Sequence, residues 1–307
     1  MEVHQLRYAV AVADSGSFTA AAATLRVSQS GVSAQVGRLE HELGVRLFER
    51  SARRVTVTPA GTDLLDRMRH VLAALDEVRS VADEVLGLVR GSVRLGAVAG
   101  LGWPAFLDAI EQVHDAHPQL ALSLREGNSA ALQSEVLAGR LDVAIVSWVD
   151  KPLPGLRWFV AVEERLAAAI GNNDHQWGTR ASVAPAELLD VPVVCLAAGT
   201  GVRAAYETMM SREGLPAPVT WEVTLPTTAR ALASRGLGAA VLTTSAADLP
   251  DALVYVPVES DYARSRLGIV WRSGHAMTAA TRIVLDALRE HLARSVSPQH
   301  HESAASR

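Results

Sequence analysis

The first 58 residues place apolar side chains three and four positions apart, in three short blocks that each predict an α-helix. The first block begins at Val3 and stops at a polar break, residues 14–16. Ser17 and Ser28 precede the second and third blocks, and serine is a preferred N-cap because its oxygen accepts an N–H that the helix start leaves unpaired. The pattern therefore predicts helix, short turn, helix.

The third of these helices has an apolar face and a face of small polar residues. Its apolar positions end at Gly44, a residue type common at helix C-termini. The opposite face carries Ser30, Ser33 and Gly37, where a solvated helix would have long charged side chains. Short polar side chains let a helix enter the DNA major groove. A polar surface helix is the alternative interpretation.

A small β-wing is predicted after the third helix. Val55 and Val57 alternate with threonines, and four arginines against one acidic residue lie between positions 46 and 54. Residues 1–58 as a whole hold seven arginines and five acidic side chains, an excess too small to indicate nucleic-acid binding by itself. The two helices together with the basic wing favour DNA binding.

Residues 59–89 predict one long helix, opened by Thr58 as N-cap and by Pro59 at the first helical position. Its apolar residues alternate spacings of four and three, a heptad stripe that a lone helix would expose to water. The C-terminal part of the chain or a second copy would cover it. We favour a second copy, because a twofold pair presents two recognition helices to two half-sites. The predicted dimerisation residues are Leu64, Met68, Val71, Leu75, Val78 and Val85.

From residue 91 onward, short strands alternate with helices, which is typical of an α/β domain with mainly parallel strands. Two successive sets of such units indicate two lobes. Lobe I is expected at 91–162 and lobe II at 163–265, and a last strand and helix within 266–294 are expected to return to lobe I. At the junction, two separate strands are predicted over 156–163 and 166–170.

Composition excludes several classes of protein. Of 307 residues, 49% are hydrophobic and 20% charged, as in globular domains rather than disordered or fibrous chains. The longest uncharged run, between Arg94 and Asp108, has 13 residues and is too short to span a bilayer. The N-terminus has no basic and apolar regions of a signal peptide. We expect a cytoplasmic protein with no membrane segment and a disordered tail at 295–307.

Residues that could carry catalysis are few. Cys195 is the single cysteine, which rules out an intramolecular disulfide and a multi-thiolate metal site. It lies in an apolar strand, where a buried, inert thiol is favoured over a redox sensor. His114 and His117 share a helix face but have no third ligand. We expect no catalytic residues, no metal and no cofactor, and therefore a protein that is not an enzyme.

Several segments resemble the LysR-type transcriptional regulators, and the resemblance spans nearly the whole chain. Four segments are similar to successive parts of the family's N-terminal signature, and two more are similar to its effector-binding domain. The six segments are Phe18–Ala22, Leu25–Ser33, Leu39–Arg50 and Thr58–Gly61, followed by Arg125–Ser129 and Gly139–Ile145.

The resemblance implies a mixed α/β fold and gives each region a role. Members usually bind an interrupted dyad of double-stranded DNA near a promoter, as homodimers or dimers of dimers. They change their DNA contacts when a small metabolite enters the cleft between the lobes. The implied domains are a winged helix-turn-helix domain at 1–58, with its helix-turn-helix at about 17–37, a linker and dimerisation helix at 59–89, and a two-lobed effector-binding domain similar to periplasmic binding proteins at 91–294.

Carried over residue by residue, the resemblance places DNA contacts on the third helix and the wing. Two positions depart from the family: Ser30 stands where proline is frequent, and Ala34 where a long polar residue is frequent. The base preference therefore stays open. The base-edge candidates are Gln29, Ser30 and Ser33, the phosphate candidates are Ser28, Arg38 and Arg50, and the minor-groove candidates are Arg53 and Arg54.

The effector site is expected at the carboxyl ends of the strands, where ligands collect in open α/β sheets and helix N-termini attract anions. Hydroxyl groups there would hydrogen-bond a ligand, a tryptophan would form an apolar wall, and Arg203 would pair with a carboxylate effector. Helix capping and core packing are the alternative roles. Gly100 stands where the family commonly has Ser or Thr. The candidates are Gly100, Trp103, Ser129, Ser147, Trp148, Thr200, Arg203, Thr227 and Thr228.

Two other functions stay open. The chain could be a DNA-binding regulator that needs no ligand or that responds through the Cys195 thiol. It could also be an enzyme domain fused to a DNA-binding module. The strand ends offer no evident base, nucleophile or metal set, which disfavours the enzyme.

Overall fold

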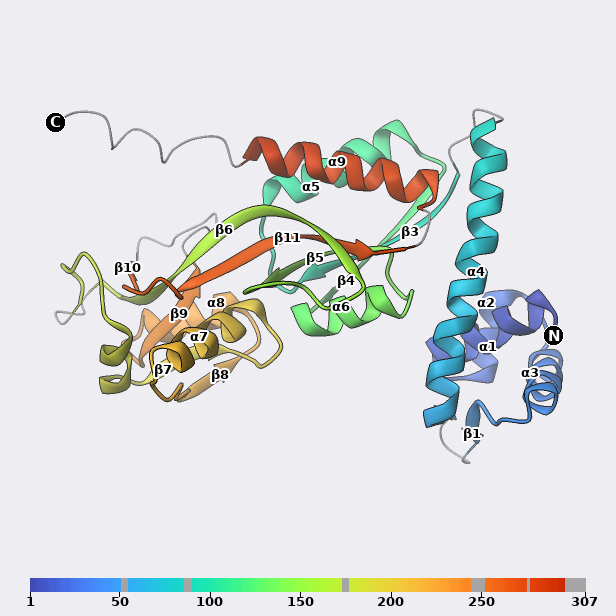
Figure 1. Cartoon of the computed structure of the whole chain (residues 1–307), viewed down its shortest axis with the longest axis horizontal. Helices are drawn as coiled ribbons and strands as arrows, with labels where there is room; N and C mark the ends of the chain where they lie inside the picture. Colours follow the sequence, from blue (N-terminus) through green and yellow to red (C-terminus); the bar gives the residue numbers. More distant parts are fainter. Residues whose placement is uncertain (51–54, 86–89, 173–176, 244–251, 275–276, 296–307) are drawn as a thin grey trace. The chain divides into compact units, whose positions relative to one another are not determined.

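The structure is a computed structural model in which the chain forms two compact units (Figure 1). The first unit holds the N-terminal helices and the long helix α4 (Pro59–Val85), and the second is built on a mixed sheet. None of the helices described is both long and apolar enough to cross a membrane. The described residues are 1–50, 55–85, 90–172, 177–243, 252–274 and 277–295.

Three helices and a two-stranded wing follow one another in the first unit, as the sequence predicts. The turn between the second and third helix is tight because Arg26 adopts a left-handed conformation (φ 56°), the one non-glycine residue of the described chain with positive φ. The predicted caps are confirmed: Ser17 Oγ accepts the Ala20 N–H at 3.3 Å, and Gly44 ends the third helix at φ 67°. The elements are α1 (Val3–Ser15), α2 (Phe18–Leu25), α3 (Gln29–Leu43), β1 (Phe48–Arg50) and β2 (Val55–Val57).

The start of α4 is built into this unit. Thr58 Oγ1 accepts the Gly61 N–H at 2.8 Å and so caps the helix. A Cβ on Gly61 would lie 2.3 Å from the Leu47 carbonyl oxygen, so only glycine fits where the helix meets the wing. Leu65 and Met68 are buried in the core that α1, α2 and α3 share.

A nine-stranded sheet runs through the second unit in the order β4-β3-β5-β11-β6-β9-β7-β8, with β10 paired to β6. β3 is parallel to β4 and β5, and β7 is parallel to β8 and β9, whereas β6 and β11 are antiparallel to their neighbours. The strands are β3 (Gly91–Val98), β4 (Leu120–Gly127), β5 (Val143–Trp148), β6 (Leu156–Gly171), β7 (Val193–Leu196), β8 (Trp221–Val223), β9 (Ala239–Thr243), β10 (Leu253–Pro257) and β11 (Arg264–Arg272).

One long strand replaces the two predicted over 156–163 and 166–170. β6 has 16 residues and pairs with β11 as far as Arg165 and with β9 and β10 beyond it, so it joins the two parallel parts of the sheet (Figure 1). The prediction of two strands was wrong because the polar residues 163–165 look like a turn. In the structure Glu163 forms ion pairs with arginines of β11, and Glu164 is buried.

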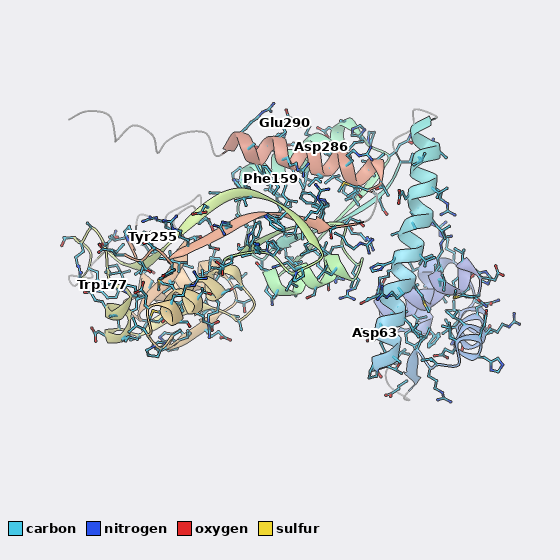
Figure 2. All side chains as sticks on the ribbon, viewed as in Figure 1. Asp63, Phe159, Trp177, Tyr255, Asp286 and Glu290 are labelled. Atoms are coloured by element: carbon cyan, nitrogen blue, oxygen red, sulfur yellow. The ribbon has the colours of Figure 1, made fainter. Side chains whose placement is uncertain are left out.

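Helices flank the sheet, and the last of them, α9, packs beside α5 and against β3. Side chains fill the space between layers, and Trp177, labelled in Figure 2, is among the largest that are fully buried. A short 3-10 helix at Pro185–Asp190 was not predicted. The α-helices of this unit are α5 (Pro104–Ala116), α6 (Ser129–Leu137), α7 (Gly201–Arg212), α8 (Pro226–Ala233) and α9 (Ala279–Ser295).

Candidate functional site

The face of α3 that carries the small polar residues is turned away from the core. The apolar face of the helix, with Val32, Val36 and Leu39, is fully buried. Of the predicted DNA contacts on this helix, Gln29, Ser30 and Arg38 are exposed and Ser33 is half-buried. The fold thus leaves these α3 residues wholly or partly accessible to solvent.

The N-terminus of α3 is suited to an anion. Ser28 Oγ accepts the Gly31 N–H at 3.1 Å and the Ser30 hydroxyl at 3.3 Å, which leaves its own hydrogen available as a donor. The first N–H groups of this 15-residue helix have no partner within the helix, and the helix dipole favours negative charge there. A phosphate would be bound at this end by the Ser28 hydroxyl and by backbone N–H groups.

The wing is tied to α3 by a residue that the sequence analysis did not select. Glu40 Oε1 accepts the N–H groups of Leu47 at 2.7 Å and Phe48 at 3.1 Å. The signal available in the sequence was an acidic residue near the end of the apolar stripe of the third helix. The structure shows that this residue is half-buried. The predictions for Arg53, Arg54 and the Arg50 side chain lie outside the described residues.

The predicted dimerisation residues of α4 divide between two environments. Leu64 and Met68 pack into the core of their own unit, because α1 lies along this part of α4, and Leu75 is half-buried. The structure therefore corrects the prediction at Met68, whose side chain is 5% exposed, and leaves Leu64 half-buried. The side chain of Val85 lies outside the described part. Further along, four apolar residues spaced three and four apart are exposed, and we call them the α4 stripe: Val71, Ala74, Val78 and Val81.

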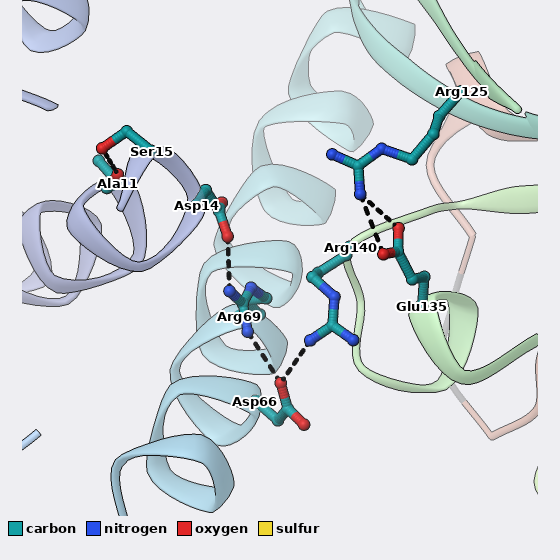
Figure 3. A network of polar contacts seen from close by, with 8 residues as sticks. All are labelled: Ala11, Asp14, Ser15, Asp66, Arg69, Arg125, Glu135 and Arg140. Carbon is teal, nitrogen blue, oxygen red and sulfur yellow. Dashed lines mark hydrogen bonds and ion pairs between the residues drawn. The ribbon is translucent and has the colours of Figure 1, made fainter. Parts of the chain in front are cut away.

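Arg69 links α1 to α4 inside the first unit, as Figure 3 shows. Its side chain is 7% exposed and contacts Asp14 at 2.5 Å and Asp66 at 2.8 Å. Figure 3 also shows Arg125 of β4, which forms an ion pair with Glu135 of α6 at 2.7 Å in the second unit. Each of these ion pairs joins two elements of one unit.

A cavity of about 600 Å³ lies in the second unit, at the carboxyl ends of β3, β4, β5 and β7 and beside β6 and β11. This volume is in the range of sites for small molecules. Apolar residues such as Val98, Leu196 and Leu267 form much of its wall. Five of the predicted effector residues line it: Gly100, Trp103, Ser129, Ser147 and Thr200.

Two of these hydroxyls are used by the fold. Ser129 Oγ accepts the Ser147 N–H at 3.0 Å. Thr200 Oγ1 donates to the Ala197 carbonyl at 2.9 Å and accepts the Arg203 N–H at 3.3 Å, so it caps α7. The Ser147 hydroxyl forms no hydrogen bond among the described residues and is available to a ligand.

The structure places the other four predicted effector residues away from the cavity. Trp148 is buried in a core on the other face of β5, because successive side chains of a strand point in opposite directions. Arg203 forms ion pairs with Glu207 at 2.7 Å and Glu222 at 3.0 Å. Thr227 and Thr228 are exposed in the first turn of α8, outside the cavity wall.

Six polar residues of the cavity wall were not predicted as effector contacts: Glu126, Asn128, Glu164, Thr224, Arg230 and Thr243. Burial raises the pKa of Glu164 to about 7, and a hydrogen bond from the Thr243 hydroxyl opposes that shift. The Arg230 guanidinium forms no ion pair or hydrogen bond with the described residues. Had one continuous strand been predicted through residues 163–165, Glu164 would have fallen on the same face as Val162 and could have been predicted as a residue of the cavity wall.

Cys195 has no access to this cavity. It lies in β7 with no exposed surface, in a core that also holds Tyr206 and Met209. Burial raises the pKa of its thiol to about 12, so the reactive thiolate form is disfavoured. In the part of the chain that the structure describes, no cluster of three His, Cys, Asp or Glu side chains could hold a metal ion.

Two protein-family models together match most of the chain. The bacterial regulatory helix-turn-helix protein model of the lysR family matches residues 3–62, and the LysR substrate binding domain matches residues 86–293. An uncharacterized HTH-type transcriptional regulator of Escherichia coli K12, YnfL, is 31% identical over 92% of this chain and 96% of its own length. The hydrogen peroxide-inducible genes activator of Dickeya chrysanthemi is 28% identical over 95% of this chain and 96% of its own.

Solved structures give the same result. A full-length OxyR variant of Pseudomonas aeruginosa, with an aspartate in place of a cysteine, superposes with a TM-score of 0.76 at 27% identity, covering 95% of this chain and 94% of the other. Full-length CbnR in complex with its target DNA shares the fold, with a TM-score of 0.60 at 20% identity over 95% of this chain and 100% of the other. The mixed α/β fold with an N-terminal helix-turn-helix is thereby confirmed. This chain belongs to the LysR family of transcriptional regulators.

Proposed function

We propose that this regulator binds an interrupted DNA dyad as a homodimer, and that a small metabolite with an anionic group binds in the cavity and changes the DNA contacts. The observation that carries the effector part is Arg230. A guanidinium in the wall of a small-molecule cavity, without a partner among the described residues, fits a carboxylate or another planar anion. The role of the cavity is binding and not catalysis.

For the DNA interface, the exposure of α3 supports the roles expected from the sequence. Gln29, Ser30 and Ser33 would contact base edges, since they lie on the exposed side of the helix near its N-terminus. Ser28 and Arg38 would contact phosphates. Arg50, Arg53 and Arg54 are proposed to extend the interface along the wing.

The α4 stripe is proposed to be the surface on which two copies pair. Val78 is 69% exposed and Val71 is 48% exposed, and both belong to the predicted heptad pattern. Water contact with a continuous apolar stripe is unfavourable, and a second α4 would remove it. Pairing through α4 gives the protein two recognition helices for the two half-sites of a dyad.

An Arg230→Ala variant tests the effector site. We expect a screen of small carboxylates to find compounds that raise the melting temperature of the wild-type protein, because a ligand at 100 times its Kd adds about 2.7 kcal/mol to the stability of the native state. Arg230→Ala should weaken the binding of such a compound about 10- to 100-fold, since one charge-assisted hydrogen-bonded pair is lost. Differential scanning fluorimetry and calorimetry measure both effects.

Arg235→Ala is the matched control, because Arg235 follows α8 and bonds only its own segment, at the Ala231 carbonyl. It should bind the compound as the wild type does. Equal affinity in Arg230→Ala and wild type would contradict the proposed site. So would a compound that binds but leaves the affinity for a dyad selected from random duplexes unchanged.

A thiol mechanism is the second candidate, because several relatives are named hydrogen peroxide-inducible genes activators. The burial and the raised pKa of Cys195 argue against it in this chain. We expect peroxide to leave Cys195 unmodified in the native protein, as measured by mass spectrometry of its peptides, and operator affinity to stay within about twofold in both wild type and Cys195→Ala.

Unfolding the protein in urea should make the same thiol react at once, which controls for the reagent. A native protein that gains an oxygen at Cys195, together with a peroxide effect on DNA binding that Cys195→Ala lacks, would establish the thiol mechanism instead.

A further inference from the structure

Glu164 is a buried carboxyl in the wall of a cavity that is otherwise largely apolar. The residue is 7% exposed and lies on β6 opposite Ser265 of β11. Its side chain has the Thr243 hydroxyl as a hydrogen-bond donor. The other charged residues of the cavity wall are Arg230 and the exposed Glu126, whose Oε1 accepts the Gly100 N–H at 3.4 Å.

Within the described residues, no cation compensates Glu164. Burial and the Thr243 hydrogen bond are the influences that act on this carboxyl, and burial is the larger, so the neutral form is favoured until about pH 7. The next residue on β6 behaves differently: Glu163 is exposed and forms ion pairs with Arg264 at 3.0 Å and Arg266 at 3.2 Å. A glutamate without a cationic partner at a buried position costs folding free energy, which an apolar residue or glutamine would avoid.

That cost is recovered if a ligand brings the missing cation. A protonated nitrogen placed against Glu164 would pair with the carboxylate in a site with little water, where such a pair is strong. A dicarboxylate would instead set a second negative charge beside Glu164. A ligand with only one carboxylate would satisfy Arg230 and leave Glu164 protonated.

We infer that the effector is an amphoteric molecule of the amino-acid class, with a protonated nitrogen that pairs with Glu164, an acidic group that pairs with Arg230 and an apolar body against Trp103 and Leu267. The inference rests on the proposed function, because it concerns the same cavity. It adds the ligand class: two opposite charges on an apolar body. One ammonium with Glu164 and one carboxylate with Arg230 would leave both pairs neutral.

Matched probes test the nitrogen. L-leucine, L-phenylalanine and L-tryptophan are compared with 4-methylpentanoate, 3-phenylpropanoate and indole-3-propanoate, which lack only the amino group. We expect at least one amino acid to stabilise the full-length protein and to bind at least about 10-fold more tightly than its deaminated partner, the equivalent of about 1.4 kcal/mol. Differential scanning fluorimetry ranks the probes and calorimetry gives their affinities.

Calorimetry also measures whether a proton is released when the ligand binds. Because burial raises the pKa of Glu164 to about 7, part of the free protein carries the neutral carboxyl at pH 7, and pairing with an ammonium group should ionise it and release a fraction of a proton per site. The released proton is measured as the difference in binding enthalpy between phosphate and Tris buffers. This measurement uses the wild-type protein and does not depend on any variant.

Two variants assign the effect. Glu164→Gln keeps the size of the side chain and a partner for Thr243, and it should remove both the proton release and the preference for the amino acid. Glu163→Gln, one residue away on the other face of β6, should retain both. Circular dichroism melting curves confirm that each variant is folded.

The outcomes separate the two proposals. Deaminated acids that bind as well as the amino acids, with an affinity that Arg230→Ala reduces, would overturn the ligand class and leave the effector site standing. An amino acid that binds without proton release and equally well to Glu164→Gln would also overturn the role of Glu164. No stabilisation by any of the three amino acids would overturn the class. Binding of acids and amino acids that is unaffected by Arg230→Ala would instead contradict the proposed function.

Discussion

Aspartates at both Val71 and Val78 are expected to separate the proposed dimer into monomers and to weaken binding to a full dyad at least about 100-fold. Val78 is 69% exposed and Val71 is 48% exposed on the α4 stripe. In a helix pair each would be buried, and a carboxylate in that seam has no cation to compensate it. The affinity loss follows because two linked DNA-binding sites gain about 10²- to 10⁴-fold over one.

Light scattering on a sizing column measures the mass of the double variant, and fluorescence anisotropy compares full dyads with half-sites. The half-site affinity should stay near that of the wild type, since α3 is untouched. Arg79→Glu is the control: it changes the net charge on α4 by the same two units, but Arg79 lies off the stripe and pairs with Asp76. A double variant that remains a dimer and binds the full dyad normally would place the pairing surface elsewhere.

The three N-terminal helices were predictable because their limits are set by neighbours in the sequence. Ser17 and Ser28 accept N–H groups three residues ahead of them, and Gly44 supplies a left-handed C-terminus. Each of these signals acts within one helical turn. The fold class follows for a similar reason, since strand and helix periodicities are local patterns.

The continuous β6 could not be predicted from such local patterns. Its polar residues are tolerated in a strand because Glu163 finds Arg264 and Arg266, which lie about a hundred positions later in the chain. The same long-range pairing buries Glu164 in the cavity. A sequence window shows polar residues and predicts a turn, and the partners that make them compatible with a strand lie outside it.

The sequence predicted only part of the lining of the candidate cavity. Strand ends located Ser147 and Thr200, because ligand sites in open α/β sheets follow the direction of the strands. The rule does not say which way a long side chain turns. Arg203 lies at the correct strand end but pairs with two glutamates. Arg230 lines the cavity instead, and it lies on α8 about one turn after the predicted Thr227.

The heptad pattern of α4 shows the same limit. Periodicity predicts that a stripe is covered but does not identify what covers it. Met68 is covered by the core of its own unit, whereas Val78 has no cover within the described chain. Contacts between elements far apart in the sequence decide which part of the stripe is left for a second copy.

Arg69→Glu is expected to destabilise the first unit by at least about 3 kcal/mol and to abolish DNA binding at temperatures where the wild type is folded. The arginine is buried and forms ion pairs with Asp14 and Asp66, so the variant would set three carboxylates together. Asp14 is 50% exposed and Asp66 30%, and solvent therefore screens part of the repulsion. A loss of this size is a large fraction of the stability of a small domain.

Differential scanning calorimetry should then show two transitions, with the one that accompanies loss of DNA binding moved to lower temperature. The transition that ligands of the cavity stabilise should stay where it is, because the cavity lies in the other unit. Arg67→Glu makes the same charge change at an exposed neighbour on α4 and should melt like the wild type. Adding Asp14→Arg to Arg69→Glu restores an ion pair with the two charges exchanged, and it should recover part of the lost stability. If Arg69→Glu melts with the wild type, the contact between α1 and α4 rests on the apolar core alone.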